Sequence, residues 1–242
     1  MYRIQKRSLY GFGNAKPLRS GTLFSSNSLN TYDAITSHCV RSRGYAQIRV
    51  ICYPLIMEIE TERLVIRDWV PAVDAAEAIA IYGSPQVTRW IGDKSVDDTV
   101  SAVQARLQRY CDRAAAQPGL GCWAVVTKSP ATIIGSLLLM PLPGRDNQPS
   151  GKVEIGWHFR PESWGRGYAT EAAAAVMAAG FDTLKLSAIY AVTLLDNDRS
   201  MRVTQRLQMI DLGITRNYYG GHPLRLFCRS RLTQPSRRPA TF

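Results

Sequence analysis

One segment, residues 153–171, reads VEIGWHFRPESWGRGYATE. Its first half, Val153–Phe159, is β-branched and aromatic and predicts a strand, whereas Trp164–Glu171 opens a helix that runs to about residue 184. Glycines in the turn between them let the backbone approach a ligand closely. The helix start adds free N–H groups and a positive dipole end. The pattern therefore predicts an anion site at this strand-to-helix turn.

Three kinds of phosphate site use such a turn. A P-loop is excluded because no Gly-Lys-Ser/Thr follows the glycines. A dinucleotide fingerprint would have Gly where Thr170 stands, and would not insert Pro161–Trp164 between strand and turn. The pyrophosphate of coenzyme A is the third option. Glycines that serve turn geometry alone are the alternative to all three.

Further elements lie on both sides of this turn. Strands are predicted where residues alternate or form short β-branched runs, at 63–69, 122–127, 132–140, 153–159, 188–194, 212–218 and 224–230. Helices are predicted at 71–82, which Gly83-Ser84-Pro85 stops, at 164–184 and at 198–209. Another is predicted from the Asp97/Asp98 cap signal to Pro118, where apolar residues recur at spacings of three and four. Residues 142–152 are predicted as a loop. This order predicts an α/β (α+β) domain with a mixed, largely antiparallel sheet of about seven strands, about four helices and at least one parallel crossover.

Charge divides the chain of 242 residues, which has a net charge of +11. Residues 1–56 hold eight basic side chains against the single acid Asp33, so they carry +7, and residues 57–242 carry the other +4. We interpret 1–56 as a basic, poorly ordered extension, from an over-long gene start or dispensable, with Met57 as a candidate start. An organelle transit peptide is the alternative. Residues 57–232 form the predicted domain, and 233–242 a flexible basic tail.

Composition excludes several classes. The five cysteines are odd in number and include no Cys-x-x-Cys pair, so neither a disulfide framework nor a zinc site is indicated. Three scattered histidines favour no metal cluster. No apolar run reaches the roughly 20 residues of a membrane span. Since most of the basic charge lies in the extension, and no aromatic stripe is interleaved with basic residues, we expect no nucleic-acid partner.

The blocks Glu154–Pro161, Trp164–Ala172 and Asn197–Ser200 resemble the GNAT acyltransferase superfamily. They look most like its RimJ/RimL-type branch of ribosomal-protein N-terminal acetyltransferases, as does the opening Thr61–Arg67. The resemblance covers roughly 57–230. It implies a GNAT-like fold that uses acetyl-CoA as co-substrate.

The resemblance also implies a coenzyme site. A splayed strand holds the pantetheine arm and polarises the thioester, a loop binds the pyrophosphate through its amides, and an asparagine bonds the arm. The matching residues are Trp157, His158, Phe159, Trp164, Gly165, Arg166, Gly167, Tyr168, Ala169, Thr170 and Asn197. The sequence departs from the family twice. Trp164 replaces the usual Gln or Arg, and Arg206–Met209 lacks the glycine that normally ends the last helix, which puts that helix end in doubt.

Two residues are the catalytic candidates. Glu154, on the strand beside the thioester, is the candidate base, directly or through water; its alternative is a strand-edge carboxylate in a salt bridge. Ser200 could donate a hydrogen bond to the departing sulfur, or only bond the backbone in a first helical turn. His158 is a less favoured base. Tyr190, Tyr218 and Tyr219 are alternative hydroxyls that strand packing also explains.

With this resemblance, we predict a cytoplasmic N-acetyltransferase that moves acetyl from acetyl-CoA to a primary amine in a ternary complex. No cysteine lies in the motif blocks, so no acetyl-cysteine intermediate is indicated. The acceptor is a protein N-terminus or a small molecule, and its identity stays open. A homodimer is the expected assembly. A non-catalytic acetyl-CoA-binding protein and a basic ribosome- or RNA-associated factor are the alternatives.

Overall fold

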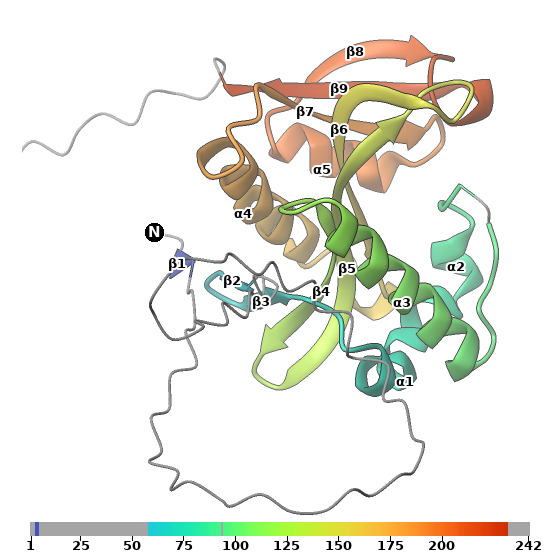
Figure 1. The fold of residues 1–242 in the computed structure, drawn as a ribbon, viewed down its shortest axis with the longest axis vertical. Coiled ribbons are helices and arrows are strands. Elements are labelled where there is room, and N and C mark those ends of the chain that lie inside the picture. The colour runs from blue at the N-terminus through green and yellow to red at the C-terminus, as the bar shows by residue number, and fades with distance from the viewer. Residues whose placement is uncertain (1–2, 5–57, 93, 232–242) are drawn as a thin grey trace, which may run out of the picture. The chain divides into compact units, whose positions relative to one another are not determined.

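One mixed sheet forms the centre of the structure, a computed structural model that describes residues 3–4, 58–92 and 94–231 (Figure 1). Its order is β1-β2-β3-β4-β5-β6-β7-β9-β8. All neighbours are antiparallel except β6 and β7, whose parallel pairing supplies the one crossover that the sequence predicted as a minimum. The strands are β1 (Arg3–Ile4), β2 (Glu58–Glu60), β3 (Leu64–Arg67), β4 (Gly121–Lys128), β5 (Ala131–Pro143), β6 (Pro149–Phe159), β7 (Ala188–Leu194), β8 (Ile210–Thr215) and β9 (Leu224–Ser230).

The predicted fold class is confirmed, with two strands more than expected. All seven predicted strands are present, and β1 and β2 precede them. The strand predicted at 212–218 lies at 210–215 instead. The loop predicted at 142–152 is shorter than expected and spans 144–148, because β5 continues to Pro143 and β6 begins at Pro149. Beyond Leu139, β5 has no partner on its β4 side, so prolines there need not donate a ladder hydrogen bond on that side.

Helices cover both faces of the sheet. They are α1 (Pro71–Tyr82), α2 (Pro85–Thr88), α3 (Val100–Ala116), α4 (Tyr168–Asp182) and α5 (Asp198–Arg206). Four of them were predicted. The short α2 was missed because Pro85, interpreted as a stop, occupies a first-turn position, where proline is well tolerated. The N-cap of α3 is Thr99 and not the predicted aspartates: its hydroxyl accepts from the amide of Ala102.

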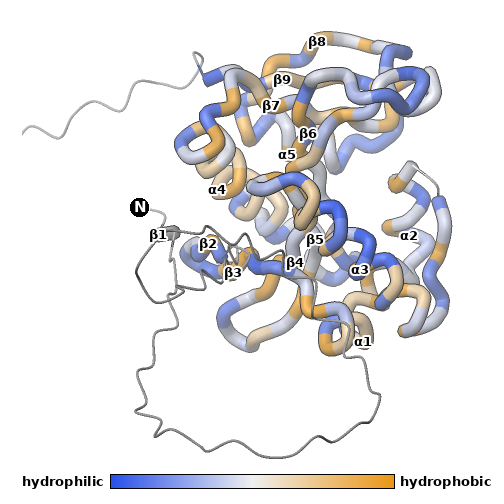
Figure 2. Tube along the Cα trace, viewed as in Figure 1, coloured by the Kyte–Doolittle hydropathy of each residue, from blue (hydrophilic) through white to orange (hydrophobic). Residues whose placement is uncertain are grey.

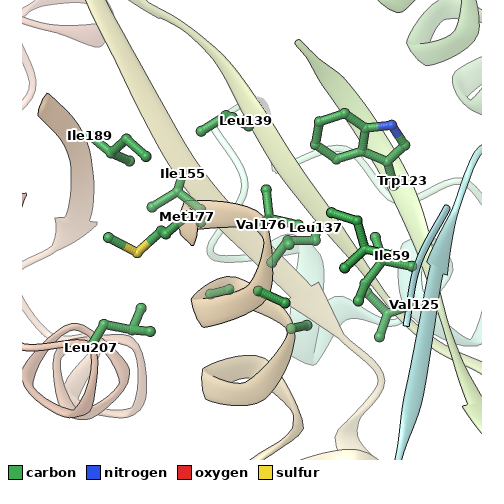
Figure 3. Close-up of a cluster of buried hydrophobic side chains, with 14 of the residues drawn as sticks. Ile59, Trp123, Val125, Leu137, Leu139, Ile155, Val176, Met177, Ile189 and Leu207 are labelled. Atoms are coloured by element: carbon green, nitrogen blue, oxygen red, sulfur yellow. The ribbon is translucent and has the colours of Figure 1, made fainter. Parts of the chain in front are cut away.

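A hydrophobic cluster lies on each face of the sheet. Trp123, Val125, Leu137, Leu139 and Ile155 point to the α4 side, where Val176 and Met177 meet them (Figure 3). The alternate residues Ala124 and Ile133 face α1 and α3. The small residues of α4 are buried, as expected of a helix that lies close against a sheet: Ala172, Ala173 and Ala175.

The helix α5 ends without the glycine that is usual at this position in the family. The helix was predicted to reach residue 209 and stops at Arg206. Gln208 then adopts a φ of 56°, the left-handed conformation that glycine adopts most easily. The amide of Met209 donates to the carbonyl of Thr204, which closes the helix end. The turn is therefore kept with a different residue.

Candidate active site

A cleft opens where the two parallel strands part. β6 and β7 pair at one position, Glu154 with Tyr190, so beyond Glu154 the β7-facing edge of β6 has no ladder partner in β7. The cleft has a volume of about 1100 Å³. It brings together every predicted site residue except Arg166, namely Glu154, Trp157, His158, Phe159, Trp164, Gly165, Gly167, Tyr168, Ala169, Thr170, Asn197 and Ser200. Arg166 is exposed beside it.

The cleft reaches both faces of the sheet. Along β6, Ile155 and Phe159 belong to the core on the α4 side. Because side chains alternate along a strand, Glu154 and His158 face the opposite side, that of α1 and α3. The ring of His158 confirms this, since it meets the edge of Tyr82 in α1 with 6.0 Å between ring centroids. This contact favours a structural role for His158 over that of a base.

The turn before α4 has the geometry of an anion cradle. Gly165 and Gly167 have φ of 77° and 81°, values that other residues rarely adopt. Gly167 is the N-cap and supplies no side chain to bond the first turn. Among the described residues, no backbone acceptor meets the amides of 165–170, and the helix ladder begins only with Glu171 donating to Gly167. Unpaired amides at a helix N-terminus are suited to bind an anion.

A network from the opening of the domain fixes this turn. Glu171, in the first turn of α4, accepts from the Thr61 hydroxyl at 2.6 Å and from the Arg63 amide at 2.9 Å. The Arg63 guanidinium bonds the other carboxylate oxygen at 2.7 Å, donates to the carbonyl of Arg166 and lies over the ring of Tyr168. Burial alone would raise the pKa of Glu171, but these donors lower it.

Trp164 has a structural reason to replace the family's usual residue. Its indole N–H donates to the carbonyl of Phe159 at 2.7 Å, which ties the turn to the end of β6. The guanidinium of Arg199, from α5, lies 4.4 Å from the centre of its ring. Trp164 therefore joins three elements around the cradle.

Polar side chains without protein partners line the same cleft. The hydroxyls of Thr170 and Thr193 are buried and have no hydrogen-bond partner among the described residues. Buried hydroxyls in that state point to a ligand or water. Asn197 caps α5, because its side-chain oxygen accepts from the amide of Ser200 at 3.1 Å. The cap uses neither the side-chain amide group of Asn197 nor the Ser200 hydroxyl, although both residues line the cleft.

Glu154 is a buried carboxyl group in the cleft. It is 6% exposed, and burial raises its pKa to about 7, although a hydrogen bond from Tyr219 opposes the rise. The Tyr219 hydroxyl donates to Glu154 from the turn between β8 and β9. In the described part of the chain Glu154 forms no salt bridge, the alternative considered for it. From the sequence, Tyr219 was only one of three tyrosines considered as alternative hydroxyls.

The described lining of the cleft is strongly cationic. Glu154 is its one carboxylate, whereas seven lining side chains are basic: Lys94, Arg106, Arg109, Arg113, Arg199, Arg202 and Arg206. A cleft lined by one sign of charge concentrates ligands of the opposite sign. Within the same described residues, no three His, Cys, Asp or Glu side chains gather as a metal site requires, and no helix is long and apolar enough to cross a bilayer.

Comparison with known proteins decides the family. The model of the acetyltransferase (GNAT) domain matches residues 63–210. The chain therefore belongs to the GNAT acetyltransferase family. It is 28% identical to the uncharacterized N-acetyltransferase YoaA of Bacillus subtilis (strain 168) over 163 residues, which is 66% of this chain and 86% of YoaA.

Solved structures show the same GNAT fold. A GNAT-family acetyltransferase from Bacillus anthracis superposes with a TM-score of 0.59 at 23% identity, over 72% of this chain and 98% of that one. The microcin C7 self-immunity acetyltransferase MccE, solved with acetyl-CoA and AMP, gives a TM-score of 0.58 at 12% identity, over 70% and 93%. At these identities the likeness concerns the fold.

The cysteines that the structure describes in this acetyltransferase lie away from the cleft. Cys111, Cys122 and Cys228 are the described ones, and none lines it. Burial raises the pKa of Cys111 to about 11 and that of Cys122 to about 12. The thiolate is the nucleophilic form of cysteine, so these thiols are poor nucleophiles at neutral pH.

Proposed function

We propose that this chain is an N-acetyltransferase that moves the acetyl group of acetyl-CoA directly to a primary amine within a ternary complex. The observation that carries the proposal is Glu154, a buried carboxyl group whose pKa is about 7 and which faces the cleft where β6 and β7 part. A general base works best when its pKa lies near the operating pH. GNAT membership supports the choice of reaction.

The residues around the cradle fit coenzyme A. The unpaired amides of 165–170 suit its pyrophosphate, and Arg199, Arg202 and Arg206 of α5 suit its phosphate charge. The buried hydroxyls of Thr170 and Thr193 and the side-chain amide of Asn197 offer polar partners along the cleft. The unpaired edge of β6, over Trp157–Phe159, offers backbone groups to the pantetheine arm.

Acetyl-CoA supplies an activated acetyl thioester. The amine nitrogen forms a bond to the acetyl carbon, the carbon–sulfur bond breaks, and the amine loses a proton. Glu154 accepts that proton, directly or through water, from the α1–α3 side of the sheet. Backbone N–H groups at the free edge of β6 polarise the carbonyl. Ser200, in the first turn of α5, donates a hydrogen bond to the leaving sulfur.

The acceptor is proposed to be an amine of low pKa, a protein N-terminus in the manner of the RimJ/RimL-type branch, or a small molecule. An α-amino group with pKa near ~7.8 is partly unprotonated at neutral pH, whereas a lysine near ~10.4 is almost wholly protonated. A base of pKa about 7 is sufficient for the first and poorly suited to the second. We propose that the enzyme is cytoplasmic and forms a homodimer.

The decisive experiment combines calorimetry with an acceptor screen. Acetyl-CoA is titrated into the full chain, and turnover is then compared on peptides with free and blocked N-termini. We expect binding that Gly167→Glu abolishes, because a side chain there requires a left-handed backbone and fills the cradle with a negative charge. Glu154→Gln should lower kcat about 10²- to 10⁴-fold at unchanged acetyl-CoA affinity.

Glu162→Gln is the matched control. Glu162 is an exposed carboxylate close to the same turn, and its loss should change neither quantity. Full activity of Glu154→Gln would remove Glu154 from the mechanism. Acetyl-CoA binding without turnover on any amine would favour the non-catalytic alternative, and nucleic-acid binding that falls steeply with salt, independent of acetyl-CoA, would favour the third class.

A further inference from the structure

A row of arginines on α3 enters the cleft from the side opposite the coenzyme cradle. Arg106, Arg109 and Arg113 are spaced by three and four residues, so they share one face of the helix, and all three line the cleft. Arg106 is neutralised by Asp97, which its Nε meets at 2.5 Å in a nearly buried pair. It also lies over the ring of Tyr82. Its role is structural.

Arg109 and Arg113 are different. Both are exposed, and neither has a carboxylate within ion-pair distance among the residues that the structure describes. Figure 2 shows that α3 mixes blue, hydrophilic segments with pale to orange ones, whereas α4 is mostly pale to orange. Two like charges one helical turn apart repel each other mildly. Because no described carboxylate pairs with Arg109 or Arg113, both charges are available to bind a ligand in the cleft.

The strand register places these arginines on the acceptor side. Glu154 pairs with Met140 of β5, and directly opposite residues point to the same face. That face is the one covered by α1 and α3, which contact each other, while α3 also contacts β4. The cradle and α5 belong to the other face. Arg109, Arg113 and Glu154 therefore line one cavity from the same side.

We propose that the acceptor amine carries an anionic group, a carboxylate or a phosphate, which Arg109 and Arg113 bind while its amino group lies at Glu154. This inference rests on the proposed function and names the chemical class of its substrate. Guanidinium groups bind carboxylate and phosphate through paired hydrogen bonds, which fixes orientation as well as charge. An acceptor with positive charge alone would be repelled by this wall of the cleft.

Binding of matched amines to the full chain saturated with coenzyme A tests this inference. The pairs are serine and serinamide, phosphoethanolamine and ethanolamine, and the amidated dipeptides Ser-Glu and Ser-Gln, measured by calorimetry. The anionic member should bind about tenfold tighter in at least one pair, as a charge-assisted hydrogen bond at an open site allows. The pair in which the difference appears tells whether the site prefers a carboxylate or a phosphate. It also indicates how far from the amine the anionic group must lie.

The double variant R109Q/R113Q should abolish that difference and leave coenzyme A affinity unchanged. Arg145→Gln, which removes an exposed charge outside the cleft, is the control and should preserve the difference. Equal binding within all three pairs overturns the inference, as does a loss of coenzyme A affinity in the double variant. Absence of coenzyme A binding contradicts the proposed function instead, and the same pairs on the free protein then decide the inference.

Discussion

Glu154 shows how one residue can serve chemistry at a cost in stability. Burial holds its pKa at about 7 in the folded protein, against 4.5 for an ordinary glutamate. Between these values the folded protein keeps a proton that the unfolded chain releases, so stability falls as the pH rises through this window. The full difference corresponds to about 3 kcal/mol above pH 7.

Glu154→Gln should therefore stabilise the protein at high pH. Glutamine resembles the neutral form of the carboxyl group, so at pH 8 the variant should be more stable than the parent by up to about 3 kcal/mol. Near pH 4, below both pKa values, the two should be nearly equal. Urea denaturation at both pH values measures the gap, and a gap that is the same at both would show that the pKa of Glu154 is not raised.

Tyr219 should set the pH at which Glu154 becomes active. Its hydrogen bond lowers the pKa of Glu154, so Tyr219→Phe should raise that pKa above about 7. Since the ionised carboxylate is the base, the rise of kcat/KM with pH should move upward by about 1 to 2 pH units. Tyr218→Phe, the adjacent tyrosine, should leave the profile in place. An unmoved profile in Tyr219→Phe would mean that the two groups are not coupled.

At the scale of elements, periodic patterns in the sequence predicted most of the fold. Alternation and short β-branched runs found the seven main strands, and apolar spacings of three and four found α3. The errors arose where one residue type has two meanings. Proline ended a helix at Pro85 in the prediction and begins α2 in the structure, and prolines suggested a loop where β5 has only one partner strand.

The candidate site was predictable only in part. The residues of the turn and of β6 were found because they are consecutive in the sequence. Glu171 with Arg63, and Glu154 with Tyr219, are contacts between residues 108 and 65 positions apart, and no local pattern reveals them. The arginines of α3 were not singled out in the sequence, and only the fold shows that they line the same cleft as Glu154.

Arg63→Ala tests the link between β3 and the cradle. Arg63 holds both Glu171 and the carbonyl of Arg166, so its loss should loosen the turn and weaken acetyl-CoA binding several-fold, since part of the binding energy would then order the turn. Arg225→Ala is the control, because its exposed pair with Asp211 lies at the β8–β9 edge. A lower melting temperature at unchanged acetyl-CoA affinity would limit Arg63 to a structural role.

For the whole molecule, net charge is a poor guide to function and its distribution a good one. The domain after residue 56 has only +4, yet its cleft gathers seven basic side chains around one carboxylate. Anionic ligands are therefore attracted to the cleft without a strongly basic domain. The +7 of residues 1–56 is a separate matter, and those residues, apart from Arg3 and Ile4, lie outside the described part of the chain.

Two truncations should separate the extension from the domain. Residues 57–242 keep β2, whose Ile59 is 2% exposed in the core, and lose only the two residues of β1 from the described sheet. This variant should fold and bind acetyl-CoA within about twofold of the full chain, since each doubling of affinity is only about 0.4 kcal/mol. Residues 64–242 also lose Thr61 and Arg63, the donors that hold Glu171, and should bind acetyl-CoA markedly more weakly. Calorimetry on both decides the matter, and loss of affinity already in 57–242 would make the extension part of the enzyme.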